Sequence, residues 1–113
     1  MKRLIDETRK QFKANLHCHS NLSDGSWTPE QIKAEYKKRG YSVLCITDHE
    51  HLIDHSDLND ENILFLTGYE YYIRDRLPFD HMVGVQTHMN FYSKTPKNKM
   101  VHYTPNMTKY IPK

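Results

Sequence analysis

The segment that most constrains the fold is a short, nearly continuous apolar run, Tyr41-Ser42-Val43-Leu44-Cys45-Ile46. Such a run is typical of a strand that is buried on both faces of a parallel sheet. A helix is predicted directly before this run. Thr28-Pro29-Glu30-Gln31 is a typical helix start, with a capping threonine, a proline at the first helical position and the glutamine of a capping box. Gly40 is expected to end the helix. Since Lys13-Ala14-Asn15-Leu16 has the pattern of an earlier strand, the order strand–helix–strand predicts a parallel β-α-β unit.

Two further strands are expected after this unit. The chain is polar and loop-like from Glu50 to Asn62, with a short helical turn expected near residues 54–58. A third strand is predicted from Ile63 through Thr67-Gly68-Tyr69 to Glu70, and a fourth from Met82 to Tyr92. The 113 residues favour one domain, 1–113, in which the lysine- and proline-containing tail 94–113 has no predicted regular structure.

Charge and composition argue against some classes of function. The formal net charge of +2 gives no electrostatic argument for nucleic-acid binding. Cys18 and Cys45 lie within apolar strand patterns, which indicates buried free thiols in a reducing compartment. Because no apolar segment follows Met1 and no run approaches membrane-spanning length, we expect a cytoplasmic protein with no membrane partner.

Histidines and acidic residues gather where the predicted strands end. His17 and His19 are two residues apart on a strand, so their side chains point to the same face, roughly 6.5 Å apart. His49 follows the second strand and Glu70 ends the third. In parallel α/β sheets the loops at this edge converge into sites. Neutral imidazole and carboxylate together suit Zn²⁺, Mn²⁺ or Fe²⁺, and Glu70 could bridge two ions.

Each of these residues also has a plainer interpretation. A single histidine at a strand end is more often a hydrogen-bonded surface residue, and Asp24 could serve only the Asp24-Gly25 turn. His51 and His55 are expected at the surface or behind the ligands. Asp48 could orient an imidazole or cap a loop. The tyrosines at 69, 71 and 72 are expected to be packing residues.

The spacing of these residues resembles that of the PHP (polymerase and histidinol phosphatase) domain family. The string His17-Cys18-His19-Ser20, with Ser23-Asp24-Gly25 and Thr28-Pro29-Glu30, is similar to its opening motif. Thr47-Asp48-His49 resembles its second motif, Gly68-Tyr69-Glu70 its Gly-x-Glu, and His88-Met89-Asn90-Phe91-Tyr92-Ser93-Lys94 a later motif in which a strand histidine is a ligand. The resemblance covers roughly residues 13 to 95, with the motifs in the family's order.

The resemblance implies a distorted β/α barrel of seven strands, about the first four of which are present here. It implies up to three divalent ions and hydrolysis of a phosphoester by a metal-bound hydroxide. His17 and His19 would bind the first ion, Glu70 would bridge the first and second, and His88 would bind the second. Asp24 and His49 would bind the third. His81, in His81-Met82-Val83-Gly84, is the alternative to His88.

One departure from the family's pattern affects the expected function. The family's later strands end in an Asp-x-His pair, and no such pair follows His88, since the last aspartate is Asp80. The chain is therefore expected to be the N-terminal, truncated portion of a PHP domain, to be completed by a partner chain, or to be a decayed relative.

Two classes of function remain open at this point. The first is a PHP-type phosphoesterase that acts on a small phosphorylated metabolite or a nucleotide, with nucleic acid as a further possibility. The alternative is an inactive remnant or a metal-binding interaction module. Because an incomplete barrel exposes strand edges, self-association is also expected.

Overall fold

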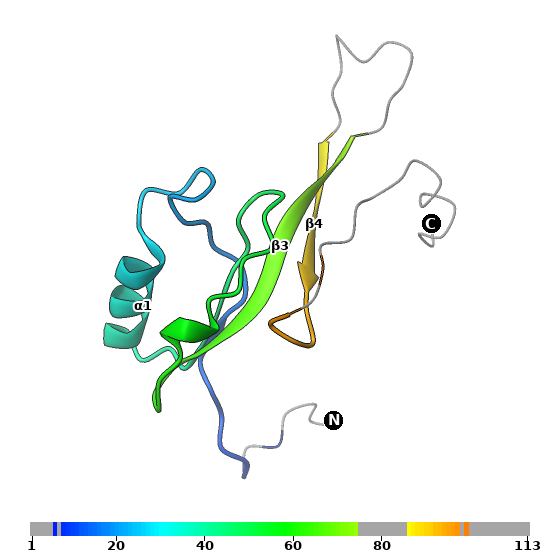
Figure 1. The fold of residues 1–113 in the computed structure, drawn as a ribbon. Coiled ribbons are helices and arrows are strands. Elements are labelled where there is room, and N and C mark those ends of the chain that lie inside the picture. Colours follow the sequence, from blue (N-terminus) through cyan, green and yellow to red (C-terminus); the bar gives the residue numbers. More distant parts are fainter. Residues whose placement is uncertain (1–5, 7, 75–85, 98, 100–113) are drawn as a thin grey trace.

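The structure is a computed structural model that describes residues 6, 8–74, 86–97 and 99 (Figure 1). It contains every element that the sequence predicts, with shifted bounds. The elements in chain order are β1 (Ala14–Asn15), α1 (Pro29–Lys38), β2 (Val43–Ile46), the 3₁₀ turn η1 (Ser56–Leu58), β3 (Leu64–Arg74) and β4 (Gln86–Tyr92). The predicted residues 82–85 of the fourth strand, and most of the tail 94–113, lie outside the described residues.

The strands form one curled sheet in the order β1-β2-β3-β4. The first three are parallel, with Ala14 opposite Val43 and Val43 opposite Leu64. β4 lies beside β3 and runs antiparallel to it, as Figure 1 shows. The fold is thus mixed α/β as expected, but the sheet is not parallel throughout. Within the described ranges no further strand closes the sheet into a seven-stranded barrel.

The helix α1 begins and ends as its sequence predicts. The Thr28 hydroxyl accepts a hydrogen bond from the Gln31 N–H at 3.3 Å, and the Gln31 side chain accepts one from the Thr28 N–H at 2.9 Å. Gly40 follows the helix with φ of +77°, a conformation that side chains with a Cβ rarely adopt.

The apolar core lies between α1 and one face of the β2–β3 pair. Ile32 of α1 packs with Leu44 and Ile46 of β2 and with Phe65 of β3, and all four are buried. Successive side chains of a strand point to opposite faces, so Cys45 points away from this core. By the same alternation Glu70 and Tyr72 lie on the face opposite Phe65, and α1 packs on the Phe65 side.

Glu70 does not end its strand, contrary to the sequence prediction. β3 continues to Arg74 because Gly68–Arg74 pairs with Gln86–Tyr92. The regular parallel pairing of β2 and β3 ends at Ile46 and Thr67, followed by one isolated bridge between His49 and Glu70. Glu70 therefore lies where the parallel part of the sheet ends, although it is inside a strand.

Among the described residues, no helix is both long and apolar enough to cross a membrane.

Candidate metal centre

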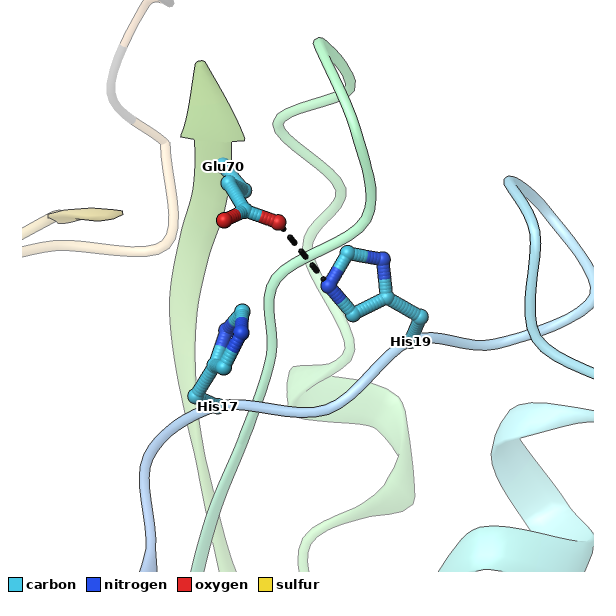
Figure 2. A group of neighbouring side chains, drawn as sticks. All are labelled: His17, His19 and Glu70. Atoms are coloured by element: carbon cyan, nitrogen blue, oxygen red, sulfur yellow. Dashed lines mark ion pairs between the residues drawn. The ribbon is translucent and has the colours of Figure 1, made fainter. Parts of the chain in front are cut away.

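Three neighbouring strands bring the predicted ligands together at one edge of the sheet. His17 and His19 lie on the segment that follows β1, and both point toward Glu70 on β3 (Figure 2). The His19 Nε2 atom is 3.0 Å from the Glu70 Oε2 atom. Parallel pairing of β1, β2 and β3 is what places residues so far apart in sequence side by side.

Glu70 is the centre of this arrangement. Glu70 is only 4% exposed, and its two carboxylate oxygens face three imidazoles. Oε2 lies 3.0 Å from His19 Nε2 and 3.3 Å from His49 Nδ1, while Oε1 lies 3.0 Å from His88 Nδ1. A buried carboxylate is costly unless it is paired, so this cluster defines a charged site rather than a surface feature.

Asp24 joins the cluster from the loop that precedes α1. Its Oδ1 atom is 2.8 Å from His19 Nδ1, and its Oδ2 atom is 3.2 Å from His49 Nε2. Desolvation raises the pKa of the Asp24 carboxyl, but the neighbouring imidazoles of His19 and His49 outweigh it and hold the pKa below its ordinary value. Asp24 is thus more than a turn residue, because it contacts two predicted ligands.

These side chains fit a divalent cation in two overlapping groups. Ligand atoms of His17, His19 and Glu70 lie within 4.8 Å of one another, as do those of His19, Asp24 and His49. The His49 Nδ1 atom is buried and makes no hydrogen bond, although it lies 3.3 Å from Glu70. Buried polar atoms nearly always have a partner, so an orphaned imidazole nitrogen beside a carboxylate fits a cation ligand. His88 adds a further nitrogen next to Glu70, while its alternative, His81, lies outside the described residues.

A hydroxyl that sequence reasoning missed orients His17. The His17 Nδ1 atom is 2.7 Å from Thr47 Oγ1, which in turn lies 3.4 Å from the Cys18 carbonyl oxygen. If Nδ1–H donates to Thr47 and Thr47 donates to that carbonyl, the Nε2 lone pair of His17 stays available for a ligand. The position of Thr47, two residues before His49, is the only sequence signal for this role.

Tyr72 packs against two of the candidate ligands. Its ring stacks on the His49 ring at 4.6 Å with an interplanar angle of 22°, and meets the His88 ring edge-on at 4.6 Å and 89°. Tyr72 is a packing residue, as predicted, but it packs on the site rather than in the core. The sequence signal for this contact is the position of Tyr72 two residues after Glu70, which puts both side chains on the same face of β3.

Among the described residues, the other side chains that the sequence singled out belong to neither ligand group. His51 is exposed and its Nδ1–H donates to the His49 carbonyl oxygen at 2.6 Å. His55 is buried at 6% exposure, so a surface position for it was wrong. Asp48 contacts the backbone and hydroxyls of the Ser20–Ser23 segment, which supports loop capping over orienting an imidazole.

Both cysteines are free thiols, as expected, but only Cys45 is buried, since Cys18 is half-buried. Burial raises the pKa of Cys18 to about 11 and that of Cys45 to about 12. Thiols with such pKa values are protonated at neutral pH and are poor nucleophiles, and among the described residues neither sulfur belongs to a group of candidate ligand atoms. The chemistry of the centre therefore rests on nitrogen and oxygen donors.

Comparison with known proteins adds to this geometry. The family model of the PHP domain matches residues 15–110. The chain is 32% identical over 89 residues to a 5'-3' exoribonuclease of Haemophilus influenzae, covering 75% of this chain and 31% of that protein. It is 41% identical over 39 residues to the DNA polymerase/3'-5' exonuclease PolX of Bacillus subtilis, covering 34% of this chain and 7% of that protein. The chain thus spans less than a third of the length of either relative. No solved structure matches it.

Proposed function

The chain belongs to the PHP domain family, and on that premise we propose that it is a metal-dependent phosphoesterase of the PHP type. The family places it among metal-dependent hydrolases, as the motifs at residues 13 to 95 predicted. The observation that carries the proposal is the contact of one buried carboxylate, Glu70, with His19, His49 and His88.

Six residues of this chain would hold the ions. His17, His19 and Glu70 form one group, and His19, Asp24 and His49 form the other, with His88 beside Glu70. Their donor atoms suit Mn²⁺, Zn²⁺ or Fe²⁺. When bound, such ions lower the pKa of water and neutralise the charge that develops on a phosphoester.

The protein's own contribution is to fix and shield these donors. Thr47 orients His17, and burial keeps Glu70 out of bulk water, which strengthens its interaction with any bound cation. The His88 side chain is 42% exposed, so solvent and substrate can reach it, as they can the 65% exposed side chain of Asp24. The Nδ1 atom of His88 faces Glu70, which leaves Nε2 to exchange a proton with a leaving group.

The relatives suggest which substrate to test first. One is named for 5'-3' exoribonuclease action and the other for polymerase and 3'-5' exonuclease action. We therefore propose a nucleotide or a nucleic-acid end as the substrate, ahead of a small phosphorylated metabolite. The near-neutral charge of the chain does not itself favour nucleic acid.

The test is hydrolysis by the full chain with Mn²⁺, using 5'- and 3'-labelled oligonucleotides, free nucleotides and a small aryl phosphate. Glu70→Gln should lower the rate by a factor on the order of 100 or more, because it removes the central negative charge of the ion cluster, an electrostatic effect of several kcal/mol. Glu61→Gln is the matched control, since Glu61 is an exposed carboxylate outside the centre, and it should leave the rate unchanged.

The opposite result would favour the second class of function. If the chain hydrolyses none of these substrates and binds one ion or none, it is a metal-binding or interaction module instead of an enzyme. If hydrolysis survives Glu70→Gln unchanged, the proposed centre is not where the reaction occurs.

A further inference from the structure

We infer that Asp48 is a positioning residue, which clamps the Ser20–Gly25 loop so that Asp24 reaches His19 and His49. The inference rests on the proposed function, because it requires that the centre bind divalent ions. It goes beyond that function because it assigns a role to a residue that is not itself a candidate ligand.

Asp48 is a buried carboxylate whose hydrogen bonds come from this loop. It is 1% exposed. Its Oδ1 atom accepts hydrogen bonds from the Ser20 N–H at 2.7 Å and from the Ser23 hydroxyl at 2.8 Å, and its Oδ2 atom accepts one from the Ser20 hydroxyl at 2.6 Å. Bonds to an ionised acceptor are stronger than neutral ones, and a buried carboxylate that loses them is strongly destabilised.

Hydrogen bonds within the loop connect Asp48 to the residues on both sides of Asp24. The Ser20 carbonyl oxygen accepts from the N–H groups of Ser23 at 3.2 Å and Gly25 at 2.9 Å, so the loop closes on the residue that Asp48 holds. The Ser23 hydroxyl also lies 3.4 Å from Asp24 Oδ1 and 3.5 Å from His19 Nδ1. Asp24 is thus positioned by groups that Asp48 fixes directly.

The two ligand groups depend unequally on this clamp, because they share His19 but only one of them contains Asp24. His49 directly follows Asp48 in the chain, so one short segment both supplies a ligand and fixes the loop that carries Asp24. His17 is instead oriented by Thr47, and Glu70 belongs to β3. Loosening the loop should therefore lower the affinity of the group His19, Asp24 and His49 for an ion. The affinity of the group His17, His19 and Glu70 should change little.

The experiment measures the number of Mn²⁺ ions per full chain and the dissociation constant of each. In Asp48→Asn one ion should bind about 10–100-fold more weakly, the usual effect of removing a residue that supports a ligand, while the other ion changes less than about twofold. Ser23→Ala should act in the same direction, and it keeps Asp48 and its bonds to Ser20 if Asp48→Asn folds poorly. Asp54→Asn is the matched control, because the Asp54 Oδ1 atom accepts from the Ser56 N–H at 2.8 Å in a turn outside the centre.

A second readout does not involve metal. In the metal-free chain, hydrogen exchange of the amides of Ser20, Ser23 and Gly25 should be faster in Asp48→Asn than in the unaltered chain. Exchange within α1 should be the same in both. Faster exchange spread evenly over the chain would indicate a general loss of stability and would overturn the positioning role.

The remaining outcomes separate this inference from the proposed function. Retention of both ions with unchanged affinity in Asp48→Asn and Ser23→Ala, while Asp24→Ala loses one ion, would overturn the clamp and leave the ligand set standing. Equal weakening of both ions would also overturn it. Unchanged metal binding in Asp24→Ala would instead contradict the ligand set, and the clamp would fall with it.

Discussion

At the scale of single residues, burial and partners separate the candidate metal centre from ordinary surface histidines. Sequence motifs predicted His17, His19, His49 and Glu70 as one group, and the structure brings them together. The motifs could not reveal that Glu70 would be buried or that Thr47 and Tyr72 would contact the ligands. Such contacts depend on the pairing of distant strands, and no local pattern encodes that pairing.

The buried His55 should make stability depend on pH. Burial lowers the pKa of His55 below its ordinary value and outweighs the raising effect of Asp48, Asp57, Asp54 and Glu30. Its Nε2 atom is also buried without a hydrogen-bond partner. As the pH falls, the unfolded chain takes up a proton at this residue before the folded chain does. The contribution of neutral His55 to the free energy of unfolding is therefore full above a pH of about 6.5 and is lost below it.

The measurement is the free energy of unfolding in urea at pH 8 and pH 5.5, for the unaltered chain and for His55→Leu. The leucine variant should lose less stability between the two pH values, since it lacks the titrating ring. Equal losses in both proteins would show that His55 titrates alike in the folded and unfolded chains.

Gly25 is a position where a methyl group should disturb both stability and metal binding. A Cβ at this residue would lie 2.2 Å from the His19 carbonyl oxygen and 2.6 Å from its carbon, and backbone atoms cannot move aside cheaply. We expect Gly25→Ala to cost about 1–3 kcal/mol, as overpacking does, and to displace Asp24. Thermal unfolding and Mn²⁺ titration check this, and an alanine variant with unchanged values in both would refute it.

At the scale of secondary-structure elements, the helix was predictable and the pairing of the last strand was not. The capping box and Gly40 define α1 through local chemistry, so the sequence alone is sufficient. The direction of β4 and the extension of β3 to Arg74 follow from contacts between two strands. An apolar strand pattern is compatible with either direction, so the sequence predicted a fourth strand without its direction.

The cap of α1 gives a prediction at this scale. Thr28→Ala removes the hydroxyl that accepts from the Gln31 N–H and should lower the free energy of unfolding by about 1 kcal/mol. Thr28→Ser keeps the hydroxyl and is the matched control. Urea unfolding measures both, and equal stability of the alanine and serine variants would argue against a contribution from the cap.

At the scale of the whole molecule, metal binding should be coupled to folding. Asp24 and Glu70 bring two carboxylates to one centre, and an ion that binds only the folded chain stabilises it by about 2.7 kcal/mol at 100 times its dissociation constant. Mn²⁺ should therefore raise the melting temperature, and a chelator should reverse the rise. The same rise in Glu70→Gln would mean that the ion binds elsewhere.

Self-association through open sheet edges stays a prediction, which sedimentation of the full chain can test.

The metal content of the purified chain tests the central claim most directly. After equilibration with Mn²⁺ and removal of unbound ions, elemental analysis counts the ions per chain in the unaltered protein, Glu70→Gln and Glu61→Gln. We predict two or three ions in the unaltered chain and in Glu61→Gln, and at least one fewer in Glu70→Gln. One ion or none in the unaltered chain, or the same count in Glu70→Gln, would contradict a multi-ion centre built around Glu70.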